Sequence, residues 1–341
     1  MYKFFDKVKN IDDFFLIKSL VIVFSKDDIN NFKDLVRIPL KEGKRRINPI
    51  CIVSDDEIYF SDYESKPYVF SLKENNLKNF KEFDFENSFY NLCLGSVYDT
   101  NENANSILLD LRTEDVIYES EYDLKKSFIS NEYVLGVVGL NATQFFFKKL
   151  KEPIEWVIDL KVLHVIGVFD EQIILHLPNF IIVGIDIYSG KELWRVNNIF
   201  GNLSLDEYEG CSLNKLRSLS WNFDGRRGCV FLFFNNYLLR LDLKKKEISV
   251  VRDFNDYENK EEWYFRESNL YYNKLTFIAS KRLGAFSNYF GVIDLDTMEI
   301  ICCQRSQSTA FYTKAPQLKE DKLYILDNNK TLYIFKKEVL Q

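Results

Sequence analysis

Histidine is almost missing from this chain, and the chemistry that depends on imidazole is limited accordingly. Only two of the 341 residues are histidine, His164 and His176, so general bases and histidine-ligated metals have few candidates. His176 follows Ile173, Ile174 and Leu175, a context that is typical of a hydrogen-bonded strand histidine. No serine nucleophile elbow, phosphate-binding loop or zinc-protease motif occurs either. We therefore predict a protein without enzymatic activity, with no catalytic residue, no metal and no cofactor.

Cysteine, excess positive charge and long apolar runs are also scarce. Six cysteines in a chain of this length do not form a disulfide scaffold, and their spacing fits no zinc motif. The 45 basic and 51 acidic residues give a net charge of −6, which argues against nucleic acid as a partner. The apolar run from Phe14 to Phe24 is interrupted by Lys18 and is too short to span a bilayer. We interpret it as a buried strand and expect a cytoplasmic protein that does not contact a membrane.

Aromatic residues, by contrast, are abundant. They make up 16% of the chain, with 30 Phe and 20 Tyr. Such side chains pack well on the pleated surface of a sheet. The composition therefore predicts an all-β fold with a large core.

A hairpin motif recurs along the sequence. Its clearest copy runs from Gly184 to Trp194, with apolar residues before Asp186, a tight turn at Ser189 and Gly190, and Trp194 eight residues after the aspartate. Counting back 38 residues from position 186 reaches Lys148, and 38 more reaches Asp110. In both copies an aromatic residue again falls eight positions later. The structural repeat residues are Asp110, Tyr118, Trp156, Asp186, Gly190, Trp194, Asp242 and Asp294.

Two later copies keep the aspartate but lose the aromatic residue. The eighth residue after Asp242 is Val250, and the eighth after Asp294 is Cys302. Both are apolar.

A repeat of about forty residues with several short strands is typical of a β-propeller blade, because one sheet cannot cover both its faces alone. We predict a single propeller domain over residues 1–341, built of four-stranded antiparallel blades, with seven blades as the main count and eight as the alternative. The N-terminal segment 1–46 contributes ring closure, with Phe32 to Leu40 as a candidate outer strand for the last blade, or forms the eighth blade. The seven predicted blades span 47–84, 85–122, 123–160, 161–198, 214–253, 263–306 and 307–338.

The Gly184–Trp194 stretch resembles the repeat of the PQQ-like β-propeller superfamily, in which the order of Gly184, Asp186, Ser189, Gly190, Lys191 and Trp194 recurs. The resemblance implies that the tryptophan docks against a neighbouring blade and that the Asp-to-Gly stretch makes the turn. It also invites comparison of Cys302 and Cys303 with the vicinal disulfide of quinoprotein dehydrogenases. Strand alternation instead predicts two ordinary thiols on opposite faces, and the expected relationship is that of a non-enzymatic member.

Two acidic turns are candidate calcium sites, Asp55 to Glu57 and Asp327 to Asn329. Both fall where strands are expected to turn, and Asp and Asn favour turns through their own backbone hydrogen bonds. We assign no metal to either.

The hairpin spacing widens after Asp186, which indicates insertions at 198–212 and 254–267. Both are rich in acidic and aromatic residues, a composition typical of a protein-binding rim. The alternative is a pair of solvated loops whose last aromatic residues simply start the next strand. The predicted partner-binding residues are Asp206, Glu207, Tyr208, Glu209, Tyr257, Glu258, Glu261, Glu262, Trp263 and Tyr264.

The sequence thus predicts a non-catalytic propeller that binds another protein. A specific version is an immunity protein that neutralises a basic toxin domain by direct binding. The alternative is an enzyme or small-ligand binder that uses the central channel, and a scaffold for several partners is the third hypothesis.

Overall fold

The chain folds into short β-strands, as its aromatic composition predicts. We analysed a computed structural model, which describes residues 2–17, 20–25, 35–39, 47–48, 57–62, 67–74, 76–79, 84–98, 104–139, 143–197, 220–234, 236–254, 263–281, 286–306 and 310–338. Within these ranges the only helix is one 3₁₀ turn, η1 (Pro178–Phe180). None of the described helical structure has the length and apolar character needed to cross a membrane. The strands form two compact units, Lys41–Ile199 and Met1–Leu40 with Phe200–Gln341.

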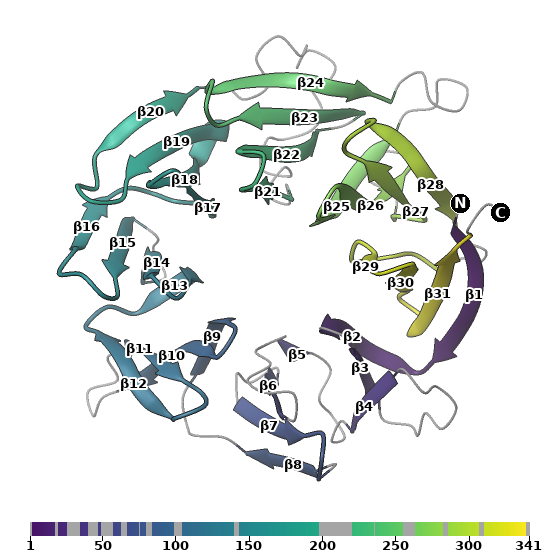
Figure 1. Cartoon of the computed structure of the whole chain (residues 1–341), viewed down its shortest axis with the longest axis horizontal. Helices are drawn as coiled ribbons and strands as arrows, with labels where there is room; N and C mark the ends of the chain where they lie inside the picture. Colours follow the sequence, from purple (N-terminus) through teal and green to yellow (C-terminus); the bar gives the residue numbers. More distant parts are fainter. Residues whose placement is uncertain are drawn as a thin grey trace. The chain divides into compact units, whose positions relative to one another are not determined.

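The unit Lys41–Ile199 contains four antiparallel sheets of four strands each, in which every strand pairs with the next in sequence (Figure 1). The sheets are β5 (Ile47–Asn48), β6 (Glu57–Asp62), β7 (Pro67–Ser71) and β8 (Asn76–Asn79); β9 (Asp84–Phe89), β10 (Leu92–Tyr98), β11 (Ala104–Asp110) and β12 (Asp115–Ser120); β13 (Leu124–Ile129), β14 (Tyr133–Val138), β15 (Gln144–Lys149) and β16 (Glu155–Asp159); and β17 (His164–Phe169), β18 (Gln172–Leu177), β19 (Ile181–Asp186) and β20 (Glu192–Val196).

The second unit also contains four sheets in its described residues. Two of them repeat the same meander: β21 (Asn222–Asp224), β22 (Cys229–Phe234), β23 (Tyr237–Asp242) and β24 (Glu247–Asp253), followed by β25 (Tyr264–Tyr271), β26 (Lys274–Ser280), β27 (Tyr289–Asp294) and β28 (Glu299–Arg305). The third joins the two ends of the chain: β29 (Gln317–Lys319), β30 (Lys322–Leu326), β31 (Thr331–Lys337) and β1 (Tyr2–Lys9). The fourth has three strands, β2 (Ile11–Ile17), β3 (Leu20–Ser25) and β4 (Leu35–Pro39).

The cores lie between successive sheets within each unit. The central strands are apolar on both faces: β22 is buried throughout, and residues of β15 and β18 are fully covered. One cluster joins Phe147 of β15 to Leu175 of β18, and another joins Phe231 of β22 to Phe277 of β26. Each sheet therefore needs its neighbour to bury its second face, which is the physical basis of the repeat.

The described residues form eight sheets, so the main prediction of seven is wrong and the alternative of eight holds. The additional sheet is β2 to β4. Two details were also predicted wrongly. The outer strand of the C-terminal sheet is β1, paired antiparallel with β31, and not residues from Phe32 to Leu40. The run from Phe14 to Phe24 is a hairpin of two strands, in which Ile17 pairs with Leu20.

The predicted blade boundaries agree with the sheets. The strands from β5 to β31 fall inside the ranges that the hairpin spacing gave, except that β9 begins at Asp84, one residue before its predicted range. The hairpin spacing is therefore a reliable marker of sheet boundaries from residue 47 onwards.

Candidate protein-interaction site

The aspartate of each repeat ends the third strand of its sheet and makes the turn to the fourth strand. Asp186 Oδ1 accepts the backbone N–H of Ser189 at 2.7 Å. Asp242 Oδ1 accepts the N–H groups of Lys244 and Lys245, each at 3.0 Å. Asp110 and Asp294 accept backbone N–H groups in the same way, from Arg112 and Asp296. The aspartates therefore shape the backbone of the turns, as the repeat predicted.

The fourth residue after each of these aspartates is in the left-handed region. Gly190 has a φ of 68°, which glycine adopts without steric cost. The same place is taken by Glu114 (φ 58°), Lys246 (φ 61°) and Met298 (φ 59°). The turn geometry is therefore kept where the glycine is not, at a cost of about 1–2 kcal/mol for a residue with a Cβ atom.

The aromatic residue of the repeat docks on the next sheet in two cases. The indole N–H of Trp156, on β16, donates to the carbonyl of Ile187 at 3.0 Å, and its ring lies beneath Gly190. Tyr118, on β12, stacks on Phe146 of β15 with ring centroids 6.3 Å apart. Cys302 is buried in the cluster between β28 and the C-terminal sheet. Val250, the corresponding residue of β24, is 44% exposed.

Trp194 is buried against its own sheet. Its indole N–H donates to Gln172 Oε1 at 2.6 Å. The ring lies so close over Gly184 that a Cβ atom there would come within 2.2 Å of Trp194 Nε1. The glycine at position 184 is thus required by close packing, in keeping with the small residue of the repeat.

The predicted rim is only partly described. Eight of its ten residues lie outside the described ranges: Asp206, Glu207, Tyr208, Glu209, Tyr257, Glu258, Glu261 and Glu262. Of the other two, Tyr264 is half-buried and Trp263 is 1% exposed. Trp263 packs edge-on against Tyr289 with ring centroids 5.1 Å apart, and its backbone N–H donates to Asn236 Oδ1. An exposed Trp263 is therefore a wrong prediction, because this residue belongs to the core that precedes β25.

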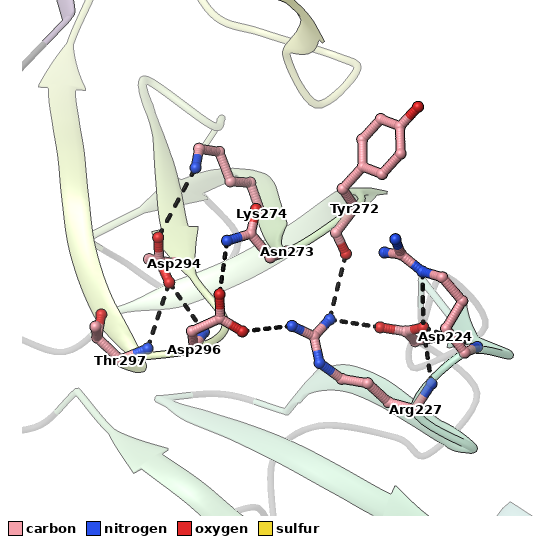
Figure 2. Close-up of polar contacts among 9 residues, drawn as sticks. Asp224, Arg227, Tyr272, Asn273, Lys274, Asp294, Asp296 and Thr297 are labelled. Carbon is pink, nitrogen blue, oxygen red and sulfur yellow. Dashed lines mark hydrogen bonds and ion pairs between the residues drawn. The ribbon is translucent and has the colours of Figure 1, made fainter.

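A second surface, which the sequence did not reveal, lies at the opposite end of these strands. It consists of the turns that join β21 to β22, β23 to β24, β25 to β26, and β27 to β28. Figure 2 shows Arg227 at its centre, between Asp224 and Asp296. Arg227 Nη1 donates to Asp224 Oδ2 at 2.7 Å and to the carbonyl of Tyr272 at 3.3 Å, and Nη2 donates to Asp296. One guanidinium thus connects two neighbouring sheets.

The carboxylates around Arg227 are held in their charged form. Burial of Asp224, 3% exposed, acts to raise its pKa, but the hydrogen bonds from Arg227 outweigh burial and lower the pKa. The pKa of Asp296 is lowered by hydrogen bonds from Asn273 and Arg227. Asp294 accepts the N–H groups of Asp296 and Thr297 in the adjacent turn. These contacts make the ends of the hairpins rigid.

Tyr272 projects from this rigid base. It is 78% exposed, the highest value among the large apolar and aromatic side chains of the described chain, and its φ is 52°. A bulky residue with positive φ is an outlier. The guanidinium of Arg226 lies 5.2 Å from the centre of its ring. An aromatic side chain in strained backbone, held from below and exposed above, is the strongest candidate for a functional group in the described residues.

Lysines extend the surface on the side of Arg226. Lys244, Lys245 and Lys246 are exposed, and Leu243 N–H donates to the carbonyl of Gly228, which joins their turn to that of the arginines. Within the described ranges these three lysines form no ion pair. We call the set of Arg226, Lys244, Lys245, Lys246 and Tyr272 the tip patch.

The first strands of three sheets enclose a groove. Its volume is about 400 Å³, and it is lined from β21, β25 and β29, among others by Trp221, Asn269, Tyr271 and Gln317. The buried polar groups below it bond to one another, since Asn222 Nδ2 donates to Ser268 Oγ at 2.7 Å. Burial raises the pKa of Tyr271 to about 12, so its hydroxyl is neutral. These polar groups link neighbouring strands by hydrogen bonds. Among the described lining residues they do not form a pair suited to general acid–base catalysis.

The two histidines face each other across β17 and β18, with parallel rings 5.7 Å apart. Burial and the neighbouring His164 lower the pKa of His176 to about 4. It is therefore neutral near pH 7. Its position in a strand agrees with the sequence prediction.

The residues considered for redox chemistry or metal binding have structural roles where the structure describes them. Cys302 packs towards the C-terminal sheet and Cys303 towards the β22 core, on opposite faces of β28 as predicted. Asp327 Oδ1 accepts the N–H groups of Asn329 and Thr331, which makes it a turn residue. Asp55 and Asp56 lie outside the described residues. In the ranges that the structure covers, no three His, Cys, Asp or Glu side chains gather closely enough to hold a metal ion.

Comparison with known proteins identifies the fold. No protein family and no curated protein sequence matches the chain. Among solved structures, the computationally designed protein Ika8 is similar over 96% of both chains, with a TM-score of 0.59 and 9% identity. The β-propeller domain of Cps50 (Swd1) from Myceliophteria thermophila has a TM-score of 0.52 at 8% identity, covering 88% of this chain and 98% of that one.

BamB from Moraxella catarrhalis aligns over 98% of this chain and 100% of its own, at 11% identity and a TM-score of 0.44, which is too low to argue from. The sheet repeat and the similarity to the Cps50 domain together show that this chain has the fold of a β-propeller built of four-stranded antiparallel blades.

Proposed function

We propose that this propeller is not an enzyme and that it binds another protein through the tip patch. The observation that supports the proposal most directly is Tyr272, which is almost fully exposed on a backbone fixed by Arg227. Tyrosine and arginine are the residues most enriched at binding hot spots. Because the hydrogen bond from Arg227 holds the backbone of Tyr272, binding has less backbone entropy to lose there.

The turn itself does not require a tyrosine. The equivalent turn between β29 and β30 has Glu320 at the same φ of 52°. A polar residue there keeps the surface hydrophilic, whereas Tyr272 exposes an aromatic ring. The exposure is thus a property that the fold alone does not explain, and a binding role supplies a reason for it.

The test is affinity purification of the tagged chain from its native host, with mass spectrometry of the retained proteins. We expect one protein to be retained in stoichiometric yield by the wild type and lost with Tyr272→Ala. The matched control is Tyr90→Ala, because Tyr90 is 70% exposed, has the same φ of 52° and is also followed by asparagine. Retention of the same proteins by wild type and Tyr272→Ala would contradict the proposal.

A more specific version is that the protein is a cytoplasmic immunity protein that blocks a basic toxin domain. It is supported by the net charge of −6 and by the acidic insertions, which would steer a basic partner. Buried thiols at Cys229 and Cys302 suit a reducing compartment. Replacing Glu258, Glu261 and Glu262 by lysine should slow association while leaving folding intact. Absence of a toxin-like gene beside the native gene would count against this version.

The stretch Gly184–Trp194 also supports a finer placement among PQQ-like propellers. Trp156 contacts the turn of the next sheet, and Gly184 and Gly190 are both packed against indole rings. The contact of Trp156 is the one that the resemblance implies for the tryptophan, whereas Trp194 packs on its own sheet. A sequence alignment of close homologues in which Trp156, Gly184, Gly190 and Trp194 co-occur would test the placement.

A second candidate function is the binding of a small ligand in the groove of β21, β25 and β29. It is favoured by the combination of aromatic and amide side chains in its lining. A thermal-shift screen with small metabolites would test it. A ligand that stabilises the wild type but not Asn269→Ala would support this candidate, and equal stabilisation of both would oppose it.

A further inference from the structure

We propose that the tip patch recognises an acidic segment of the partner, with Tyr272 as the central anchor. This inference rests on the proposed function in one respect only, which is that the partner is a protein. It adds the chemical character of the segment that is bound. The charges of the described residues around Tyr272 carry the argument.

The acidic groups near Tyr272 are already engaged. Asp224 is buried and bonded to Arg227, and Asp296 is bonded to Arg227 and Asn273. Asp242 is occupied by two backbone N–H groups of its own turn and lies 3.5 Å from Arg240. The carboxylates therefore have little capacity left to attract a basic ligand.

The cations of the same surface are available. The side chain of Arg226 is 63% exposed and makes only a long contact with Asp224, at 3.8 Å. Lys244, Lys245 and Lys246 are exposed and form no ion pair among the described residues. Exposed cations with at most weak pairing in an otherwise acidic protein create a local positive potential, which favours a segment rich in aspartate or glutamate.

The geometry suits a peptide that crosses from one sheet to the next. Arg226 lies over the ring of Tyr272, so the cation and the aromatic face form one continuous contact between the two sheets. The lysine turn adjoins the arginine turn through the bond from Leu243 to Gly228. An apolar side chain of the peptide would contact Tyr272 while its carboxylates meet Arg226 and the lysines.

A polyanionic nucleic acid is the competing ligand for such a surface. A nucleic acid carries a charge on every phosphate, so the net charge of −6 opposes it more than it opposes a short acidic segment. The patch also carries a single exposed aromatic ring, whereas single-stranded nucleic acids stack on several. We therefore make nucleic acid an outcome of the test.

The probes are short fluorescein-labelled peptides, measured by fluorescence anisotropy at low and high salt. One alternates glutamate and serine around a central leucine, one has lysine in place of glutamate, and a labelled thymidine oligonucleotide is the third. We expect the wild type to bind the acidic peptide only, with affinity that falls as salt rises. Tyr272→Ala and the triple change of Lys244, Lys245 and Lys246 to glutamate should each weaken binding by about tenfold or more. Tyr90→Ala should bind as the wild type does.

The remaining outcomes would contradict either this inference or the proposed function. Failure of the acidic peptide to bind, equal binding of the lysine peptide, or equal binding of the oligonucleotide would overturn the inference. The protein captured from the host separates this inference from the proposed function. If Tyr272→Ala loses that protein but the lysine reversal retains it, the acidic segment is wrong and protein binding at the tip patch stands. If neither change affects capture, both are wrong. Thermal unfolding of each variant excludes loss of fold as the cause.

Discussion

The hairpin around Asp186 and the hairpins of the tip patch place their aromatic side chains in opposite environments. In the first, the aromatic side chains point into the protein: Trp156 lies under Gly190, and Trp194 covers Gly184. In the second, Tyr272 points out and the buried group is a carboxylate, Asp224, clamped by Arg227. Contacts with a neighbouring sheet therefore determine whether an aromatic side chain near a turn is buried.

This difference separates positions that carry stability from positions that carry binding. A buried aromatic side chain contributes to the stability of the fold through burial and packing. An exposed one contributes little to folding and is free to contact a partner. Five predictions, in decreasing order of the change in stability, test whether the two regions divide in this way.

Trp194→Ala should lower the free energy of unfolding by roughly 3–5 kcal/mol, as for other buried aromatic truncations. The change opens a cavity over Gly184 and leaves Gln172 without its indole donor. Tyr272→Ala is the comparison variant and should change stability by less than about 0.5 kcal/mol. Urea unfolding of both proteins measures the difference. Equal losses would show that the two aromatics do not have separate roles.

Acidification should act first on the sheet β17 to β20. The pKa of His176 is about 4 in the folded protein against 6.5 ordinarily, owing to burial and His164. The unfolded chain therefore binds more protons between these pH values, and stability falls as pH drops from 6.5 to 4, by roughly 3 kcal/mol in total. His176→Gln should flatten this part of the stability profile.

The aspartates beside the tip patch should affect stability only at lower pH. Asp224, Asp242 and Asp296 all have lowered pKa values, so the stability they confer is present above the ordinary pKa of aspartate and is lost as pH falls below it. Thermal unfolding of His176→Gln at pH values below the ordinary pKa of aspartate would measure their contribution together with that of other carboxylates with lowered pKa values, such as Asp110 and Asp186. A variant profile as steep as the wild type between pH 6.5 and 4 would contradict the assignment to His176.

Gly190→Ala should cost about 1–3 kcal/mol. The residue has a φ of 68°, and an added Cβ atom would lie 3.0 Å from the ring of Trp156. Strain in the left-handed region and the displaced indole both oppose folding. Thermal denaturation measures the loss. The double variant with Trp156→Ala provides the control, because the alanine should cost less once the ring is gone.

Lys246→Gly should have the opposite sign. Lys246 occupies the position of Gly190 in its own turn, with a φ of 61°. Glycine removes the steric cost but adds freedom to the unfolded chain, so we expect a gain of about 0.5 kcal/mol. Met298→Gly is a second case with the same geometry. A loss of stability in both would mean that the left-handed turn is not strained.

The sequence predicted the repeating part of the fold because the aspartate turns are local. Asp186 and Asp242 bond to backbone groups two or three residues away, so their spacing marks the sheets. In the sequence, no copy of the Asp186 motif was found for the eighth sheet. Its strand β4 pairs parallel with β3, a connection that leaves no short hairpin signal. Strand β1 was missed because its partner β31 lies at the other end of the chain.

The candidate site was less predictable than the fold. Trp263 has the composition of an exposed anchor, yet the bond to Asn236 and the contact with Tyr289 place it in the core. The Arg227 network unites positions 224, 272 and 296, which come from two sheets. No spacing within a repeat indicates such a contact, because it forms only when neighbouring sheets pack.

Local sequence was enough to predict most strands, the aspartate turns and the placement of Cys302 and Cys303 on opposite faces of a strand. Each of these features depends on interactions between residues that are close in the sequence. Tertiary structure decided which aromatics are covered, how the chain ends are joined in one sheet, and that Arg227 holds Tyr272 at the surface. These features depend on contacts between sheets, and burial and long-range pairing are properties of packed sheets, not of single segments.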